Sequence, residues 1–471
     1  MQKERQLKKA KPSLDDQGLM WFAVALLVGL VVWMLPTPDG LSPHAHIYLA
    51  MISSLLVLFL TEPIPLPMVM ALGASAMIIL GIGGTSQVWT PFAHPVVFFV
   101  LGCLMVAAVA EKVGLTRRLA QVLIRYCGTN VVRFSFFSCM VLGTAASIMH
   151  DVSAVTLGIM TILPLMREAS IRPGSRTGIF LIIALTFSCS AGGMGTLVGG
   201  GRNMVAAAFL QDMTGLTISF EQWLIRVLPL IFFNIPAVWA AVYIVFKPDR
   251  SLHFSDSLQH AKRKPLSINE MKALVVVALV FIGFFTSGLH GLDYSVVVVV
   301  GVAVLLLMGV VDWNFINERT EWAVSFLVFG GGISLGHAMD YTGAGEYLAQ
   351  VFFPAFEGRG WFLLFIGIGV FASLMTELMA NVAAASLIMP IAIPMAQMGN
   401  IDPTIVALAL GMFTSFSYLI VVGCPPNVVA YSFGYFKSSD LFKGGLLAQP
   451  LGMLATALAA LVWWNIIGFV G

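Results

Sequence analysis

Charged side chains are scarce in this chain. Of its 471 residues only 10% are Asp, Glu, Lys or Arg, whereas 59% are hydrophobic. A water-soluble domain could not solvate its surface with so few charges. The formal net charge is only +2, which excludes the clustered basic face that a nucleic-acid partner requires. The composition therefore indicates a protein that crosses the lipid bilayer many times.

Cysteine is also scarce, and what there is has no pattern. The chain has five cysteines, an odd number without paired metal-ligand spacing: Cys103, Cys127, Cys139, Cys189 and Cys424. This spacing excludes both a disulfide framework and a zinc site. We interpret these residues as small apolar side chains.

Apolar runs and basic loops predict an all-α polytopic membrane protein. The tail 1–18 is basic, precedes the first apolar run and is not followed by a small-residue cleavage site, so it is cytoplasmic and not a signal peptide. We expect about 11 transmembrane helices plus two re-entrant hairpins, with the C-terminus outside. Besides a first helix from residue 19 and two interrupted ones, the expected spans are 46–61, 67–83, 95–111, 225–246, 273–290, 294–311, 322–338 and 445–470.

Two long apolar runs carry polar residues at their centres. Residues 134–165 are interrupted by His150 and Asp151 and have arginines at both ends, so both ends should be cytoplasmic. Each arm of roughly 16 residues would reach about 24 Å, less than the bilayer core of about 30 Å. This predicts a re-entrant hairpin, and 361–397, broken near Asn381, predicts a second. The alternative for the second run is two ordinary spans joined by a short loop.

Two further runs predict helices that are broken within the membrane. Residues 178–210 contain a glycine-rich stretch from Ser190 to Asn203, and each glycine costs a helix about 1 kcal/mol relative to alanine. Residues 405–433 are broken at Val422-Gly-Cys-Pro-Pro-Asn427. Carbonyls and helix ends freed at such breaks can coordinate ions.

The two breaks are related by an internal repeat. Residues 198–205 align without gaps on 422–429, and each follows a polar-tipped hairpin. The halves 19–246 and 273–471, joined by a cytoplasmic linker at 247–272, are separated by an odd number of crossings. They are therefore predicted to be inverted repeats, which place substrate and ion sites between facing tips.

The segment Ala380 to Pro390, preceded by Thr376-Glu377, resembles the Ser-Asn-Thr hairpin motif of the divalent anion:sodium symporters. The segment Gly423 to Asn427 is similar to that family's Gly/Ala-Thr-Pro-Pro-Asn loop. The family carries dicarboxylates, citrate or sulfate. The resemblance implies a plasma-membrane homodimer, in the inner membrane if the protein is bacterial, with a scaffold domain and an elevator-like transport domain. It also implies two sodium ions and one anion held by tips and loops together.

The resemblance implies a sodium site in the second half. Its ligands would come from Thr376, Ala380, Asn381 and the carbonyl of Gly423, neutral oxygens that suit Na+. Ala380 and Val382 stand where the family has Ser and Thr, so two hydroxyls are lost. The candidate anion contacts of both halves are Asn381, Val382, Pro425, Asn427, Gly200, Arg202, Asn203 and Ser153. Alternatively, Asn381 only caps its own hairpin.

The first half departs further from the family pattern. Its tip contains His150 and Asp151, and its loop has Gly199 and Arg202. Our hypothesis is that Arg202, held by Asp151, replaces the first sodium ion. Arg202 could instead bind the anion in bidentate fashion, or close a purely structural pair with Asp151. His150 could sense protons or simply be hydrogen-bonded.

Other polar residues are assigned structural positions. Glu377 is expected to be protonated or bonded to hairpin amides, and His337 and Asp340 to lie at an outer interface. The sequence thus predicts a secondary active transporter for a small divalent anion, coupled to Na+ through one retained site. The alternatives are a Na+-independent anion exchanger and a cation/proton antiporter with Asp151 as carrier. No nucleophile with a base and oxyanion motif indicates an enzyme.

Overall fold

The computed structural model describes residues 16–115, 118, 129–254, 265–320, 322–421 and 423–470. Within these ranges the chain is helical, and the one β interaction is an isolated bridge between Asn130 and His253. The expected all-α class is therefore confirmed for the described residues. Cys127, most of the tail 1–18 and the centre of the linker 247–272 lie outside them.

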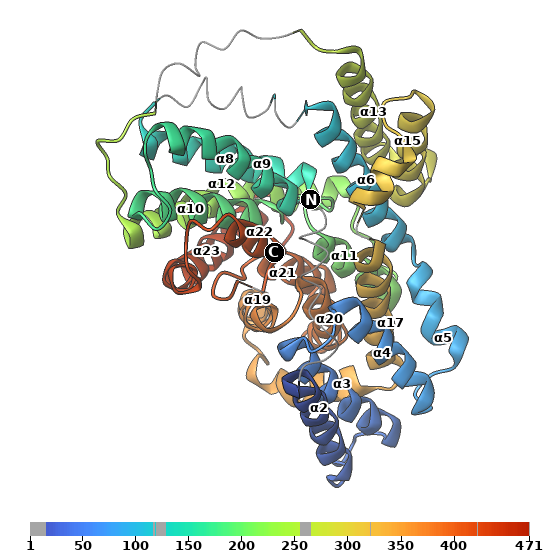
Figure 1. The fold of residues 1–471 in the computed structure, drawn as a ribbon. Coiled ribbons are helices and arrows are strands. Elements are labelled where there is room, and N and C mark those ends of the chain that lie inside the picture. The colour runs from blue at the N-terminus through green and yellow to red at the C-terminus, as the bar shows by residue number, and fades with distance from the viewer. Residues whose placement is uncertain are drawn as a thin grey trace.

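The helices form two groups, each drawn from both halves of the chain (Figure 1). The first group, blue and yellow in the figure, contains α2 (Asp16–Met34), α3 (Pro43–Thr61), α4 (Leu66–Ile79), α5 (Thr85–Trp89), η1 (Thr90–Ala93), α6 (Pro95–Val113), α13 (Ile268–Phe285), α14 (Ser287–His290), α15 (Tyr294–Leu307), α16 (Trp313–Arg319), η3 (Val324–Phe329) and α17 (Gly330–Tyr341). The second group, green and orange to red, contains α8 (Val131–Met149), α9 (Asp151–Glu168), α10 (Arg176–Gly192), α11 (Gly201–Thr214), α12 (Phe220–Phe246), α19 (Gly360–Leu378), α20 (Asn381–Met398), α21 (Pro403–Phe413), α22 (Pro425–Ser432) and α23 (Ser438–Ile466). Helix α18 (Ala344–Phe352), followed by η4 (Phe353–Ala355), contacts α17 and α20 and so connects the groups.

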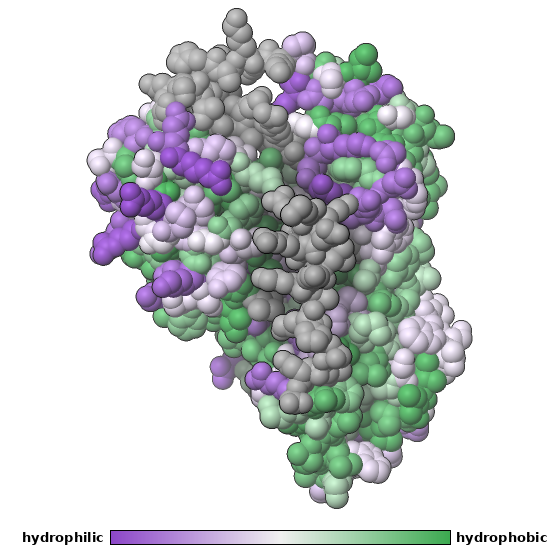
Figure 2. Space-filling view, in the orientation of Figure 1, coloured by the Kyte–Doolittle hydropathy of each residue, from purple (hydrophilic) through white to green (hydrophobic). Residues whose placement is uncertain are grey.

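The molecule has the surface of a membrane protein. In the described residues nine helices are long and apolar enough to cross a bilayer, or ten if the bent pair 313–319 and 324–341 is one span. Hydrophilic side chains gather in the upper part of the view in Figure 2, while hydrophobic ones cover most of its lower right. A polytopic membrane protein is thus confirmed. The count of 11 crossings stays a prediction, because helices such as α4 and α15, with 14 residues each, reach only about 21 Å.

Both expected hairpins consist of two helices with a very short break. In the first, His150 alone separates α8 from α9, and in the second Met379 and Ala380 separate α19 from α20. The arms have 18 or 19 residues, longer than expected, because the helices continue into the flanking polar residues. Asn130, for example, caps α8 by accepting hydrogen bonds from the amides of residues 132 and 133.

Both broken helices lie at the centre of the second group. In α10 every residue from 177 to 192 is buried, and in α21 every residue from 404 to 413 is buried. The loop 193–200 separates α10 from α11, and the loop 414–424 separates α21 from α22. Helix α22 begins with Pro425 and Pro426, which fit the first helical turn because its amides have no partner within the helix. The fold therefore carries both loops into the interior.

Candidate functional site

Four helices begin at one cavity. They are α9, α11, α20 and α22, and their first residues, Asp151, Gly201, Asn381 and Pro425, all line a cavity of about 1060 Å³. A helix N-terminus carries about half a positive charge and favours anions. The shared arrangement of two hairpins and two broken helices thus creates a positive field at one place.

The cavity lies between the two helix groups. Its far wall comes from the first group and is largely apolar, with residues such as Leu66, Val100, Leu104 and Phe329. Glu62, Glu111 and Arg319 also line it, and the last two pair at 3.3 Å with about half of each side chain exposed. We interpret this charged part as the mouth of the cavity.

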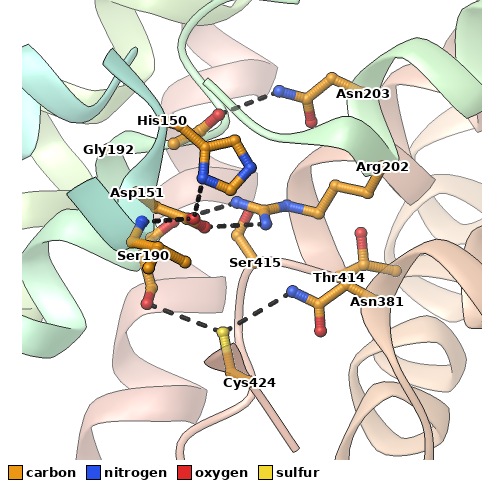
Figure 3. A network of polar contacts seen from close by, with 12 residues as sticks. His150, Asp151, Ser190, Gly192, Arg202, Asn203, Asn381, Thr414, Ser415 and Cys424 are labelled. Atoms are coloured by element: carbon orange, nitrogen blue, oxygen red, sulfur yellow. Dashed lines mark hydrogen bonds and ion pairs between the residues drawn. The ribbon is translucent and has the colours of Figure 1, made fainter. Parts of the chain in front are cut away.

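Arg202 connects the first hairpin tip to the second broken helix (Figure 3). Its Nη1 donates to Asp151 Oδ2 at 3.0 Å, and its Nε donates to Ser415 Oγ at 2.9 Å. Its Nη2 donates to the carbonyl oxygen of Ser190 at 3.3 Å. The residue is only 3% exposed. This guanidinium is therefore a fixed, buried positive charge in the wall of the cavity.

Asp151 is held from several sides. Its Oδ1 accepts a hydrogen bond from the amide of Val152 at 2.8 Å and lies 3.1 Å from His150 Nδ1. Only 2% of the residue is exposed. His150 itself has φ 68 and ψ 139, a conformation that costs a non-glycine residue about 1 to 3 kcal/mol and concentrates at functional sites. The first tip is thus a strained turn around a buried ion pair.

The second tip brings neutral oxygens together. One end of the Asn381 amide lies 2.6 Å from Thr376 Oγ1 and 3.3 Å from the carbonyl oxygen of Gly423. When Oδ1 occupies this end, three oxygens face one another, an arrangement that suits a small hard cation. Ala380 is the remaining expected ligand. Its carbonyl oxygen accepts a hydrogen bond from the amide of Ala384 in α20 at 3.0 Å. The residues present therefore fit a sodium ion.

Asn203 and Asn427 make the same contacts in the two loops. Asn203 Nδ2 donates to the carbonyls of Gly193 and Thr196, ten and seven residues earlier. Asn427 Nδ2 donates to the carbonyls of Ser417 and Ile420, also ten and seven residues earlier. Both side chains are fully buried and neither lines the cavity. They support the loops from behind, so the structure does not bring them to the predicted anion site.

The glycines of the loops permit close approach. A Cβ on Gly200 would lie 2.9 Å from Arg202 Cζ, and one on Gly199 would lie 2.4 Å from the carbonyl oxygen of Gly193. A Cβ on Gly423 would lie 2.5 Å from Ser417 Oγ. Of these three, Gly423 lines the cavity, whereas Gly199 and Gly200 do not. Gly199 and Gly200 therefore leave space for the Gly193 carbonyl and for the Arg202 guanidinium, respectively.

The other predicted site residues separate into two sets. Those that line the cavity are His150, Asp151, Ser153, Arg202, Ala380, Asn381, Val382 and Pro425. Thr376 does not line it and is fully buried behind Asn381. The structure thus joins residues from both halves into one site.

Sequence reasoning missed several partners. Glu377 accepts hydrogen bonds from the amides of residues 418, 419 and 420 at 2.7 to 3.1 Å, which belong to the loop 414–424 and not to the hairpin as expected. Ser415, a partner of Arg202, stands in a short run of hydroxyl residues with Thr414 and Ser417, and nothing in that run indicates which of them would meet the arginine.

His337 also has a partner that the sequence did not indicate. His337 Nε2 lies 3.0 Å from Asp212 Oδ2, and His94 Nε2 lies 3.4 Å from the same atom. Asp212 of α11 therefore contacts both histidines, and these contacts connect the two helix groups. Among the residues that the structure describes, no group of three or more His, Cys, Asp or Glu side chains could hold a metal ion.

Comparisons with known proteins agree along nearly the whole chain. Residues 17–470 match the family model described as "Sodium:sulfate symporter transmembrane region". The chain is 25% identical to an "Uncharacterized transporter" of Haemophilus influenzae, over 95% of this chain and 97% of that one. It is 23% identical to the "Sodium-dependent dicarboxylate transporter SdcS" of Staphylococcus saprophyticus, over 96% and 92%. It is 22% identical to the "Na(+)/citrate cotransporter" of Rattus norvegicus, over 94% of each chain.

Proposed function

Because the chain belongs to the sodium:sulfate symporter family, the divalent anion:sodium symporters that its motifs resemble, we propose that it carries a small divalent anion together with Na+. The dicarboxylate or sulfate class is the substrate class that this family and the named relatives support. The protein is a transporter and not an enzyme. The observation that carries the proposal is the position of Arg202 among four helix N-termini at one cavity.

The field at the cavity favours an anion over a cation. The positive ends of α9, α11, α20 and α22 begin at the same space. Arg202 adds a guanidinium with several N–H donors, although the Asp151 carboxylate balances its charge. Asp151, which a cation/proton antiporter would need as a carrier, is hydrogen-bonded to Arg202. A carboxylate held by a buried arginine is a poor proton carrier. This pairing disfavours the antiporter.

Sodium coupling rests on the second tip. Thr376, Asn381 and Gly423 supply three convergent oxygens. At the first tip the guanidinium of Arg202 takes the place of an ion. One sodium ion is therefore carried per cycle at the retained site, and the first site holds its positive charge permanently.

A second candidate is Na+-independent exchange of anions. A permanent charge at the first tip, supplied by Arg202, allows the anion to bind without an ion there. If the second tip also binds the anion without Na+, and the carrier crosses the membrane only when loaded, each anion that enters must be exchanged for one that leaves. Exchange driven by internal anion distinguishes this candidate from symport.

Alternating access follows from the two helix groups. We propose that the first group is the scaffold domain, the second is the elevator-like transport domain, and the halves of the chain are inverted repeats with 11 crossings and two re-entrant hairpins. The N-terminus is then cytoplasmic and the C-terminus outside, in the plasma membrane or a bacterial inner membrane, and the protein is a homodimer. Counted from the cytoplasmic N-terminus, the fourth expected span, 95–111, ends on the cytoplasmic side at Glu111, which pairs with Arg319. Both residues line the cavity, which supports an inward-facing state.

The test is uptake of labelled succinate and sulfate into proteoliposomes containing purified protein. Uptake is measured with an inward Na+ gradient, with choline in place of Na+, and with unlabelled anion inside. Na+-dependent uptake is expected for one of the two anions. Uptake that ignores Na+ but requires internal anion would establish the exchanger, and absence of uptake under every gradient would contradict both.

A further inference from the structure

Asn381 stands between the proposed sodium ligands and Arg202. One end of its amide faces Thr376 Oγ1 and the Gly423 carbonyl, at 2.6 and 3.3 Å. The other end lies 3.2 Å from Arg202 Nη1 and 3.7 Å from Cys424 Sγ. The Asn381 amide thus contacts the proposed sodium ligands at one end and the guanidinium of Arg202 at the other.

The amide has two orientations of different chemistry. With Nδ2 toward Thr376, it donates to Thr376 Oγ1 and to the Gly423 carbonyl, while Oδ1 accepts from Arg202 Nη1. In the other orientation, Nδ2 donates to Cys424 Sγ, as Figure 3 shows, and Oδ1 accepts from the hydroxyl of Thr376. It then faces a second oxygen at Gly423, and Nδ2 faces the donor group of Arg202. Without a cation the first orientation satisfies every group, and the second does not.

A sodium ion reverses this preference. An ion among Thr376 Oγ1, Asn381 Oδ1 and the Gly423 carbonyl requires the second orientation, because a cation needs oxygen and not an amide N–H. In that orientation the amide no longer accepts from Arg202. Arg202 Nη1, which also donates to Asp151, loses one acceptor at the cavity wall and becomes a free donor for an anion.

We propose that the Asn381 amide turns over when Na+ binds, and that this turn couples the ion to the anion through Arg202. The inference rests on the proposed Na+-coupled transport and assigns its coupling to one side chain. Asn381 is a positioning residue for Arg202 as well as a ligand for the ion. By thermodynamic reciprocity, the anion must raise the affinity for Na+ by the same factor as Na+ raises the affinity for the anion.

The first tip cannot work in this way. Asp151 occupies the corresponding position at the start of α9, and an ionised carboxylate has only acceptors. It binds Arg202 in the same manner whether or not an ion is present elsewhere. The coupling therefore resides in the second tip, where the side chain has one donor end and one acceptor end.

The experiment measures the Na+ affinity of purified protein in nanodiscs, from tryptophan fluorescence, with and without saturating succinate or sulfate. For the wild type, the anion is expected to tighten Na+ binding about tenfold, within the 5- to 150-fold range of typical couplings. Asn381→Ser keeps an oxygen and the same net charge but has no amide. Its Na+ affinity falls, and the anion changes it by less than about threefold.

Two further variants complete the design. Asn381→Asp, with two acceptor ends, is also expected to show a coupling below about threefold, and it serves if the serine variant does not fold. Cys424→Ala removes the sulfur that accepts from Asn381 Nδ2 at 3.7 Å. Because thiol sulfur is only a weak acceptor and the amide itself is kept, this variant is expected to retain a coupling close to that of the wild type. Simple attraction between Na+ and the anion predicts an unchanged coupling in Asn381→Ser, and that result would overturn the proposal.

Uptake by the wild type distinguishes failure of the proposed symport from failure of the Asn381 amide turn. Uptake that ignores the Na+ gradient would contradict the proposed symport itself. Na+-dependent uptake combined with wild-type coupling in Asn381→Ser would leave symport standing and remove only the amide turn.

Discussion

The two hairpin tips differ in charge, because one contains an ion pair and the other only neutral groups. At the first tip the charge is the guanidinium of Arg202, fixed by Asp151, Ser190 and Ser415. At the second tip, neutral oxygens of Thr376 and Gly423 surround the Asn381 amide. The first arrangement is a permanent ion pair, whereas the second, under the proposed function, would exchange its sodium ion with solution. The site would then combine a built-in guanidinium with an exchangeable cation.

The backbone beneath the two tips is nevertheless alike. Gly200 and Cys424 are both extended residues directly before a helix, with φ −162 and −142. The difference lies in space, because a Cβ at residue 200 would press on the Arg202 guanidinium. Position 200 therefore needs a glycine because Arg202 lies against it. Position 424 can hold a cysteine, because the corresponding residue of its helix is Pro426 and not an arginine.

The largest expected effect comes from breaking the charge pair at the first tip. Arg202→Met leaves the Asp151 carboxylate buried without its partner, which should lower the free energy of unfolding by about 3 to 5 kcal/mol. Asp151→Asn combined with Arg202→Met removes both charges and should recover most of that loss. Thermal unfolding of the detergent-solubilised protein measures both.

The matched control at the second tip is Thr376→Val, which removes one neutral hydroxyl and should cost about 1 kcal/mol. If Arg202→Met proved no more damaging than Thr376→Val, the pair would not be the buried ion pair that separates the two tips.

The next effect tests what the two halves share. Asn203→Ala and Asn427→Ala each remove two hydrogen bonds to loop carbonyls. Each should lower the free energy of unfolding by about 2 to 3 kcal/mol, because buried carbonyls are left without donors. Near-equal losses in chemical denaturation are expected. A large loss of anion affinity in Asn203→Ala with unchanged stability would instead support direct contact with substrate.

These asparagines also show where sequence reasoning reaches its limit. The repeat alignment paired Asn203 with Asn427, and family likeness suggested substrate contacts for both. The chain positions were equivalent, but the direction of a side chain at a helix start depends on the helix rotation, which no spacing within a loop defines. The amides consequently lie behind the loops and away from the cavity.

The helices themselves were more accessible to prediction. All four helix interruptions are encoded locally, by a polar tip within an apolar run or by clustered glycine and proline, and helices end and begin at these points. That the two tips belong to re-entrant hairpins stays a prediction. Asp151 and Arg202 could be paired because two opposite charges in an apolar interior need each other. Glu377 and His337 could not be assigned, because their partners lie at least 41 and 125 residues away and include featureless backbone amides.

A smaller effect tests the link between glycine and arginine. Gly200→Ala would place a methyl group 2.9 Å from Arg202 Cζ, and crowding of this kind costs about 2 kcal/mol. The guanidinium should shift away from Asp151, and anion uptake should fall. Cys424→Ala changes the equivalent position of the second half but removes an atom instead of adding one. It should lower the free energy of unfolding by only about 1 kcal/mol and leave uptake near the wild-type rate. Equal effects of the two changes on uptake would show that the close contact with Gly200 does not hold the Arg202 guanidinium in place.

The smallest expected effect concerns hydroxyl groups next to the anion. Val152 and Val382 both line the cavity and both follow the first residue of a helix. Val382→Thr restores a hydroxyl that the family pattern has, and one added hydrogen bond should tighten anion binding by up to about tenfold, or about 1.4 kcal/mol. Competition by unlabelled succinate or sulfate against labelled uptake measures this change.

Val152→Thr is the matched variant at the first tip, and there the gain should be smaller. Asp151 lies directly beside Val152 and already accepts its backbone amide. A hydroxyl placed there meets a carboxylate that attracts its proton and repels an approaching anion. An anion that gained equally from both hydroxyls would have to sit midway between the tips. A gain at Val382 alone would place the anion at the second tip. There the proposed sodium ion would attract the anion, whereas at the first tip the Asp151 carboxylate repels it.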